Sequence, residues 1–218
     1  MKKSYAILGL GSLGRYLTEA LYDAGAELLI ADIDSETISQ YADKCTYAMS
    51  ADLSDPEAIK ALGIKNVDVA IICMGQSLGP SVMCTMVAKE LGVPRVIAKA
   101  TTKQMEAILY KVGADEVINI EEDSAHRLAR RLMSDSFLEY FDLGNNLAIV
   151  DLYPKPEWIG KNLRELNLRQ KYNINVVAVK SDNEMSSHID PDLPLAKESR
   201  LVVIGEKSDI EKLFGRIV

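Results

Sequence analysis

The sequence predicts an α/β protein built on a doubly wound parallel sheet, and three observations lead to this prediction. Short, almost continuously apolar runs alternate with segments of helical periodicity between residues 5 and 120. Runs of this kind are typical of parallel strands that are buried on both faces. A glycine-rich turn follows the first run, and an acidic residue closes the second. Turn and acid in this order are typical of a βαβ unit that binds a nucleotide.

The elements follow one another in regular alternation. We expect strands at residues 5–10, 28–31, 46–49, 67–73, 95–98 and 116–120. Helical spacing covers residues 13–24, 35–42, 56–62, 81–91 and 103–112. Glycines stand where four of these helices should end, as is usual at C-terminal caps: Gly25, Gly63, Gly92 and Gly113. These alternating elements predict a first domain over residues 1–122.

The turn after the first strand contains Gly9, Gly11 and Gly14. Gly9 allows a tight strand-to-helix turn, Gly11 lets the backbone approach a pyrophosphate, and Gly14 lets helix and strand pack closely. Ser12 and Leu13 then open the helix, whose free amides and macrodipole favour an anion. A tight turn without a ligand is the alternative interpretation of the glycines alone.

An acidic residue at the end of the second strand supports the nucleotide interpretation. Asp32 lies 18 residues beyond Gly14 and is followed by Ile33, close to the spacing of about 20 residues expected for a ribose-binding acid. Its carboxylate should accept hydrogen bonds from a free ribose diol and repel a 2′-phosphate. The first domain is therefore predicted to be a Rossmann-type nucleotide-binding domain.

The chain changes character after residue 122. Apolar residues spaced by three and four predict a helix of about five turns over residues 123–142. This helix either packs on its own sheet or crosses to a second subunit. The break at 144–146 suggests a linker to a small α/β domain with strands at 147–153, 175–179 and 200–204, helices at 163–171 and 208–217, and a loop at 181–184. A domain so small is marginal alone, which favours packing against a copy of itself.

Composition excludes several classes of protein. A formal net charge of −7 and a pI near 5.0 argue against nucleic acid as a partner. No apolar run approaches the roughly 18 to 20 residues that span a bilayer, so we expect a cytoplasmic protein. Cys45, Cys73 and Cys84 lack metal-site spacing and lie among apolar neighbours, as reduced core cysteines do.

Catalytic residues are not evident in the sequence. It has two histidines, His126 and His188, and neither has an obvious acidic partner that would place it as a general base. A nucleophile elbow, a zinc motif and a Walker loop are also missing. We therefore expect the nucleotide to act as an effector that biases a conformational equilibrium. The protein is then expected not to be an enzyme. A small NAD-dependent oxidoreductase, or a nucleotide or redox sensor of another partner, remains the alternative.

The order of motifs resembles the regulator-of-potassium-conductance (RCK) family. After the glycine turn and Asp32 come Asp52, then Met74-Gly75 after the fourth strand, Lys99 after the fifth and Glu121 after the sixth. A long helix and a small α/β tail follow, and the tail includes a family-like string at residues 163–172. The whole chain is similar to the cytosolic two-domain regulatory subunits of Ktr and Trk potassium-uptake systems.

The resemblance implies a fold and an assembly. Residues 1–122 correspond to a TrkA-N-like domain, 123–143 to a crossover helix and hinge that swaps between subunits, and 144–218 to a TrkA-C-like domain. Such subunits form dimers that assemble into an octameric ring beneath a potassium-translocating membrane protein. Nucleotide binding reshapes the ring, and the subunit lies at the inner face of the membrane.

The resemblance also implies ligands. The family binds ATP and ADP, or NADH and NAD. By correspondence the three glycines hold phosphates, Asp32 holds the ribose, and the remaining nucleotide-binding candidates are Ser12, Leu13, Ile33, Asp52, Leu53, Met74, Gly75 and Lys99. Asp52 falls near the adenine, and Glu121 matches an acid that helps bind a divalent cation at the dimer interface.

Two departures from relatives concern ligand choice. Many Ktr subunits carry an arginine between the second and third glycines, where this chain has Ser12, and Arg15 follows Gly14. If that arginine senses a terminal phosphate, this chain lacks the usual triphosphate sensor. Some relatives bind cyclic di-AMP in the tail. The corresponding positions are Arg169, Asn175 and Pro191, and Arg164 replaces an apolar neighbour.

Overall fold

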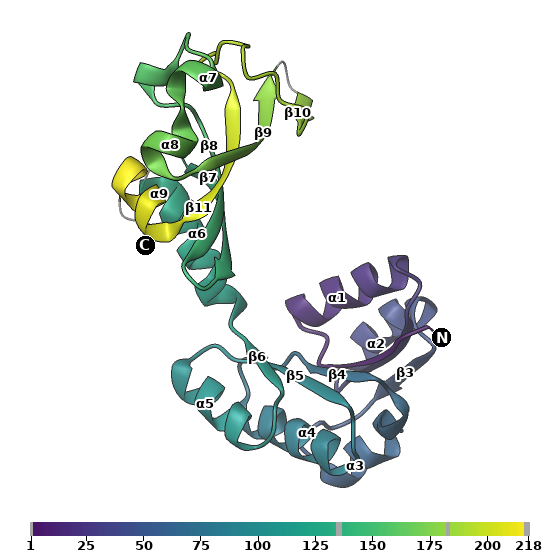
Figure 1. Ribbon diagram of the computed structural model, residues 1–218. Coiled ribbons are helices and arrows are strands. Elements are labelled where there is room, and N and C mark those ends of the chain that lie inside the picture. Colours follow the sequence, from purple (N-terminus) through teal and green to yellow (C-terminus); the bar gives the residue numbers. More distant parts are fainter. Residues whose placement is uncertain (1, 134–136, 182–183, 216–218) are drawn as a thin grey trace. The chain divides into compact units, whose positions relative to one another are not determined.

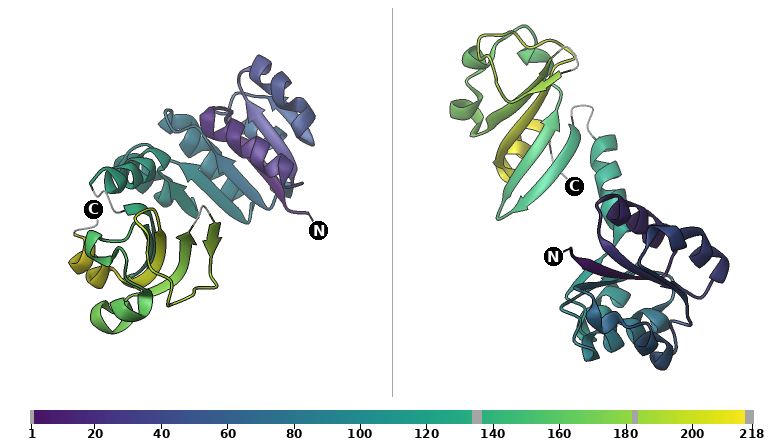
Figure 2. Two further views of the ribbon diagram at one scale, coloured as in Figure 1. Left: turned by 90° about the horizontal axis from the view of Figure 1, so that it is seen from above. Right: turned by 90° about the vertical axis from the view of Figure 1, so that its right-hand side faces the viewer.

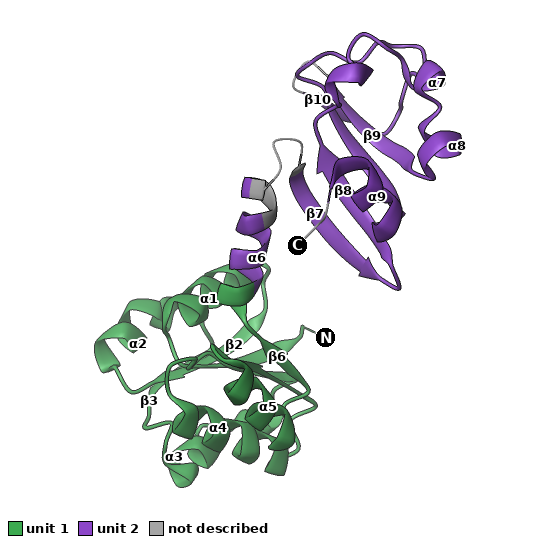
Figure 3. Ribbon diagram, turned by 90° about the vertical axis from the view of Figure 1, so that its left-hand side faces the viewer, with its two compact units in different colours: residues 1–122 green, residues 123–218 purple. Residues whose placement is uncertain are grey.

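The computed structural model describes residues 2–133, 137–181 and 184–215. The chain divides into two compact units, Met1–Glu122 and Asp123–Val218, which Figure 3 shows in different colours. Each unit has its own sheet and its own core, and each is described by itself below.

The first unit contains a six-stranded sheet in the order β3-β2-β1-β4-β5-β6. Every neighbouring pair is parallel. The strands are β1 (Ser4–Leu8), β2 (Glu27–Asp32), β3 (Tyr47–Ser50), β4 (Val69–Ile72), β5 (Arg95–Lys99) and β6 (Glu116–Ile118). The predicted doubly wound Rossmann-type sheet is confirmed, and its strand order reverses between β1 and β4.

Helices cover both faces of this sheet (Figure 1). One face carries α1 (Ser12–Asp23) and α2 (Ser35–Tyr41), and Leu17 of α1 and Ile38 of α2 pack with Ile7 and Ile30. The other carries α3 (Pro56–Ala61), α4 (Leu78–Glu90) and α5 (Lys103–Lys111). Short 3₁₀ turns lie at Ala42–Lys44 (η1) and Ile64–Asn66 (η2). Helix α4 begins three residues before the predicted start because Pro80 is tolerated in a first turn.

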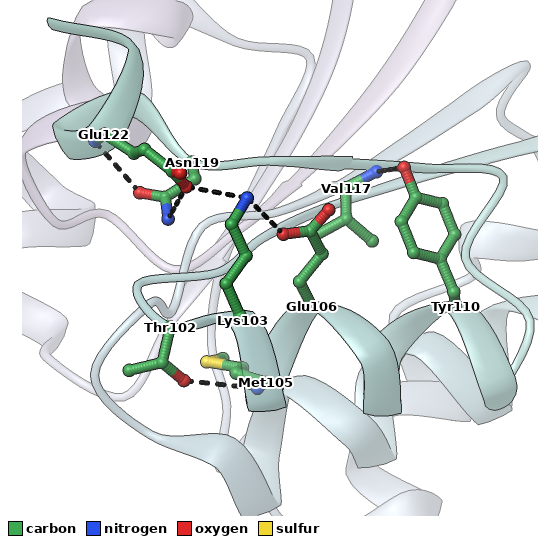
Figure 4. Close-up of polar contacts among 8 residues, drawn as sticks. All are labelled: Thr102, Lys103, Met105, Glu106, Tyr110, Val117, Asn119 and Glu122. Carbon is green, nitrogen blue, oxygen red and sulfur yellow. Dashed lines mark hydrogen bonds and ion pairs between the residues drawn. The ribbon is translucent and has the colours of Figure 1, made fainter. Parts of the chain in front are cut away.

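Helix α6 (Ile120–Met133) starts directly after β6, and its start is held by side chains (Figure 4). The Asn119 carboxamide oxygen accepts the Glu122 amide at 3.2 Å, and its NH₂ donates to the Glu122 carboxylate at 3.0 Å. Lys103 at the start of α5 pairs with Glu122 at 2.9 Å and with Glu106 at 3.2 Å. The start of α6 is thereby tied to α5 within the first unit.

The predicted helix over 123–142 is wrong in its second part. Helix α6 ends at Met133, residues 134–136 lie outside the described residues, and Phe137–Gly144 form strand β7. This strand pairs antiparallel with β8 (Leu147–Leu152). Its aromatic residues suit a strand, and their spacing did not distinguish the two structures. The crossover segment 123–143 is thus part helix and part strand.

The predicted linker at 144–146 is also wrong, because these residues belong to a hairpin. Gly144 pairs with Leu147, which leaves a two-residue turn between β7 and β8. Asn145 and Asn146 have φ angles of 49° and 65°. Positive φ at both central residues is the requirement of a type I′ hairpin turn, and asparagine tolerates it better than most residues.

The second unit has a five-stranded antiparallel sheet in the order β10-β9-β11-β8-β7 (Figure 2). Its further elements are the strands β9 (Asn175–Ser181), β10 (Glu184–Ser186) and β11 (Arg200–Glu206), the turn η3 (Pro156–Trp158), and the helices α7 (Leu163–Leu166), α8 (Leu168–Tyr172) and α9 (Lys207–Phe214). Trp158, Leu166, Leu168 and Ile210 pack with Val150 and Val203 of the sheet.

Three predictions for this unit need correction. The expected helix at 163–171 is two short helices, because Asn167 between them adopts a left-handed conformation with φ 46°. The loop expected at 181–184 is flanked by paired strands, since Ser181 pairs with Glu184, while 182–183 lie outside the described residues. The last helix ends at Phe214 before Gly215 with φ 93°, and residues 216–218 lie outside the described part.

Candidate nucleotide-binding site

The predicted site residues gather at one edge of the first sheet. The glycine turn follows β1, Asp32 ends β2, Met74 and Gly75 follow β4, and Lys99 ends β5. Since the strands are parallel, their carboxyl ends lie at the same edge. The strand order reverses between β1 and β4, and open α/β sheets bind ligands at such a switch point.

The three glycines have different environments, as their expected roles require. Gly9 has φ 97°, and a Cβ atom on it would lie 2.6 Å from Met74 Cγ. A Cβ atom on Gly14 would lie only 2.0 Å from the carbonyl oxygen of Gly9, so helix and turn are in close contact there. A Cβ atom on Gly11 would meet nothing within 4 Å. The open space is thus beside Gly11, where a phosphate is expected to approach the backbone.

The N-terminus of α1 is available to an anion. Gly11 is the N-cap, it provides no side-chain cap, and the first turn carries no acidic residue. The first amides of a helix have no partners within the helix, so they can donate to a phosphate. Leu13, in the first turn of α1, is half-buried and packs against the core, so its backbone amide is the group that can take part in anion binding. Arg15 donates from Nε to the Leu10 carbonyl at 2.7 Å, which braces the turn.

Asp32 is bonded to the glycine turn itself. Its Oδ2 atom accepts the Leu10 amide at 2.5 Å, and its Oδ1 atom accepts the Asp34 amide at 2.9 Å. A carboxylate has about four acceptor positions, so hydroxyl groups of a ribose can still bind to it. Ile33 beside it is exposed. Asp32 therefore both shapes the turn and offers acceptors at its rim.

Asp34 is a residue that the sequence argument missed. Its carboxylate accepts the Glu36 amide at 3.0 Å and the Thr37 hydroxyl at 2.7 Å. These bonds, the Thr37 bond above all, lower the pKa of Asp34. Asp34 caps α2 in this way, and the signal for it was present as an Asp two residues before a Glu at a helix start.

The two candidate nucleotide-binding residues after β3 differ in whether their side chains can reach a ligand. Asp52 is exposed, and its Oδ1 atom accepts the Ser54 hydroxyl at 2.6 Å and the Ser54 amide at 2.9 Å. Both bonds lower the pKa of Asp52, so the carboxylate is charged at neutral pH. The Leu53 side chain is buried in the core, and its carbonyl lies 3.5 Å from Cys84 Sγ. Asp52 can face a ligand, whereas the side chain of Leu53 cannot.

Gly75 is in contact with Lys99, the last residue of β5, and with Thr101 just after it. A Cβ atom on Gly75 would lie 2.9 Å from Lys99 Cδ and 3.0 Å from Cε. The Thr101 hydroxyl donates to the Gly75 carbonyl at 2.9 Å. Lys99 lies across Gly75, and its ammonium continues to Glu121 at the start of α6. Thr101 was missed by the sequence argument because a threonine after a strand has no distinguishing spacing.

Glu121, the candidate metal ligand, is engaged by a lysine. Lys99 Nζ lies 2.5 Å from Glu121 Oε1, and this bond lowers the pKa of the Glu121 carboxyl. The described residues hold no group of three or more His, Cys, Asp or Glu side chains suited to a metal ion. Divalent cations such as Mg²⁺ and Ca²⁺ take six or more ligands, so the Glu121 carboxylate would supply only part of such a coordination shell.

The tail positions that correspond to a cyclic di-AMP site are only partly brought together. Arg169 and Asn175 line a cavity of about 200 Å³ beside α7 and α8. Pro191 is not among its lining residues, and its carbonyl accepts the Arg164 amide at 3.2 Å. The Arg164 guanidinium pairs with Asp192 at 2.8 Å, so this departure from the family pattern forms a surface ion pair.

The histidines lie at the surface, and two of the three cysteines are buried as expected. His126 and His188 are exposed. Burial raises the pKa of Cys73 and of Cys84 to about 12, which keeps both thiols protonated and unreactive. Cys45 is half-buried and free, like the other two.

Comparison with known proteins assigns both units. The TrkA-N domain family matches residues 5–120, and the TrkA-C domain family matches residues 147–217. The chain is 33% identical over 218 residues to Ktr system potassium uptake protein C of Bacillus subtilis (strain 168), covering 100% of this chain and 99% of the relative. It is 30% identical over 210 residues to Ktr system potassium uptake protein A of the same organism, covering 96% and 95%.

Solved structures show the same fold. The GsuK channel matches 100% of this chain with a TM-score of 0.72 at 18% identity, and the GsuK channel bound to NAD matches 100% with a TM-score of 0.67 at 17% identity. This chain spans 40% of the length of each of those channel chains. The two domain matches and the full-length relatives together show that the chain belongs to the RCK family of TrkA-N and TrkA-C domain proteins, and that it is homologous to the Ktr and Trk potassium uptake proteins.

Proposed function

We propose that this protein is the nucleotide-binding regulatory subunit of a potassium uptake system. Its nucleotide is an effector whose binding changes potassium transport by a separate integral membrane subunit. The observation that carries the proposal is the glycine turn at the switch point, with open space beside Gly11 and the Asp32 carboxylate at its rim. The turn lies in a chain that is homologous over its whole length to Ktr system potassium uptake proteins.

The ligand is an adenine nucleotide without a 2′-phosphate, that is ADP or ATP, or NAD or NADH. The Asp32 carboxylate favours a ribose diol and repels an additional phosphate at this position. Related solved structures support this chemistry, since they include GsuK bound to NAD and GsuK bound to ADP.

Self-association is part of the proposed function. Leu128 and Leu132 of α6 are 54% and 76% exposed, and their spacing of four residues places them on the same face of the helix. A second copy of the chain is the partner that we propose for them, in a dimer that assembles further into an octameric ring. In the described part of the chain, no helix is long and apolar enough to cross a membrane. Attachment to the inner face of the membrane would then come from the potassium-translocating subunit.

Glu121 is proposed to take part in binding a divalent cation. Its carboxylate lies at the first turn of α6 and already binds one cationic group, the Lys99 ammonium. Phosphate oxygens of a bound nucleotide and a second Glu121 from a partner subunit would supply further oxygen ligands of the kind that Mg²⁺ and Ca²⁺ prefer.

Gly11→Ala tests the proposal. Gly11 has φ −65°, which alanine adopts without strain, and an added methyl group would occupy only the space reserved for phosphate. We expect normal folding and at least a tenfold loss of ADP and NAD affinity in calorimetry. Gly79→Ala in α4 is the matched control, because its Cβ atom would also meet nothing within 4 Å.

A second experiment measures potassium uptake in cells whose uptake depends on this protein. Gly11→Ala should alter nucleotide-dependent uptake, and Gly79→Ala should leave it unchanged. Substrate-dependent oxidation of NADH by the purified protein, with uptake equal in both variants, would contradict the regulatory role and favour an oxidoreductase.

A further inference from the structure

The first unit contains a cavity at the edge of the sheet opposite the glycine turn. It has a volume of about 490 Å³ and is lined by the beginnings of β1, β2 and β3 and by the connection from α3 to β4. Because the strands are parallel, their beginnings lie at the other edge from Gly9, Gly11 and Gly14. This size is within the usual range of about 300 to 1,000 Å³ for small-molecule sites. The cavity is therefore separate from the proposed nucleotide site.

The cavity arises from short elements. Strand β3 has four residues and forms an edge of the sheet, and α3 has only six. Gly63, with φ 76°, ends α3 and turns the chain into η2 before it can cover the beginnings of β2 and β3. Leu29 and Tyr47 are register partners and so project from the same face of the sheet. Tyr47 remains 64% exposed, although it is a large aromatic side chain.

The lining combines an apolar floor with one charge. Leu28, Leu29, Leu62 and Val67 are buried residues that contribute to the wall. Glu27 is the one lining residue that is charged at neutral pH, and the cavity has no lysine or arginine in its wall. Within the described residues, the Glu27 carboxylate makes no hydrogen bond or ion pair.

The nearby carboxylate of Asp68 differs from that of Glu27 because it is hydrogen-bonded within the protein. The Asp68 Oδ2 atom accepts the Ser4 amide at 2.8 Å and the Ser4 hydroxyl at 2.9 Å, so this carboxylate is bonded within the protein. The Glu27 carboxylate has no such protein partner and can therefore bind a ligand. The hydroxyl of Thr46 and the amide of Asn66 add polar groups at the wall.

We propose that this cavity binds a small organic cation with an aromatic or aliphatic body. The body packs against Leu29 and Leu62, and the ammonium group lies between the Glu27 carboxylate and the exposed ring of Tyr47. A cation over an exposed tyrosine ring gains additional attraction from the ring quadrupole. An anion would be repelled by Glu27 and would find no basic side chain in the wall. The proposal is independent of the nucleotide function, because it uses none of the same residues.

Tryptamine and indole-3-propionate are a matched pair of probes, since they share the indole ring and carry opposite charges. In heteronuclear NMR of the full-length protein, tryptamine should shift the resonances of Leu29, Tyr47 and Val67. Indole-3-propionate should bind at least threefold more weakly. Glu27→Gln and Tyr47→Ala should each weaken tryptamine binding by roughly threefold or more, the scale of an exposed charge pair or cation–π contact.

Two further variants separate this site from other effects. Glu198→Gln removes an exposed carboxylate in the second unit and should leave tryptamine affinity unchanged. Asp32→Ala should also leave it unchanged while weakening ADP binding, so failure of one proposal does not imply failure of the other. Equal affinity of the two probes, or of Glu27→Gln and the wild type, would overturn the proposal. So would shifts confined to residues away from the cavity.

Discussion

Lys99 and Glu121 connect the end of β5 to the first turn of α6 by a hydrogen bond of 2.5 Å between Nζ and Oε1. The lysine side chain is only 16% exposed, whereas the glutamate is 59% exposed. The lysine stem also lies against Gly75, one of the residues at the proposed nucleotide site. One side chain thus contacts both the candidate site and the helix that leads into the second unit.

Lys99→Met should raise the pKa of Glu121. Methionine retains the apolar stem beside Gly75 but removes the ammonium group that lowers this pKa. Carboxyl titration by NMR measures the shift. Stability should fall by no more than about 1 kcal/mol, because the pair is largely exposed on the glutamate side. An unchanged Glu121 pKa would show that the ion pair does not form in solution.

The same pair predicts a pH dependence. Since the folded-state pKa of Glu121 is lowered, its contribution to stability is present above the ordinary glutamate pKa of about 4.3. The contribution is lost as the pH falls through the folded-state value. Urea unfolding of the wild type and Glu121→Gln should therefore differ at neutral pH and converge in acid. A difference that grows as the pH falls would contradict this sign.

Asp32→Ala should weaken ADP or NAD binding by about 1 to 3 kcal/mol, the scale of a charge-assisted hydrogen bond to a ligand. The substitution also removes the acceptor for the Leu10 amide, so the glycine turn should exchange its amide hydrogens faster. Calorimetry with NAD and NADP on the wild type completes the test. Tighter binding of NADP than of NAD would contradict the role of Asp32.

Gly14→Ala should destabilise the first unit by about 1 to 3 kcal/mol, the usual cost of overpacking. The added Cβ atom would lie 2.0 Å from the backbone oxygen of Gly9, so the turn itself would have to shift. Gly79→Ala, also in a helix but with open space around it, should be neutral or slightly stabilising. Thermal unfolding that ranks the two variants equally would refute the close packing at Gly14.

Leu132→Asp should weaken self-association without unfolding the chain, because the side chain is 76% exposed. A charge at this position would have to be desolvated in any interface that covers α6. Met86→Asp, at an exposed apolar position on α4, is the control. Light scattering at micromolar concentration should show a dimer or larger species for the wild type and the control. A monomeric wild type would contradict the proposed assembly.

The sequence predicted the first unit well because its signals are local. The apolar runs predict strands, and the glycine turn predicts a tight connection, from a few neighbouring residues each. The structure places the glycine turn and Asp32 at the carboxyl ends of the strands, as expected. In the second unit the aromatic segment at Phe137–Gly144 has spacing compatible with a helix or a strand. Pairing with β8 decides for the strand, and pairing is a contact that local spacing does not report.

By itself the sequence therefore determined the class of fold, the order of elements in the first unit and the position of the glycine turn between β1 and α1. Only the tertiary structure decided that Asp32 holds the Leu10 amide, that Lys99 crosses Gly75 to Glu121, and that short α3 and β3 leave a cavity beside Glu27. The physical reason is distance along the chain. Each of these contacts joins residues that are far apart in the sequence, so it exists only once the sheet has brought them together.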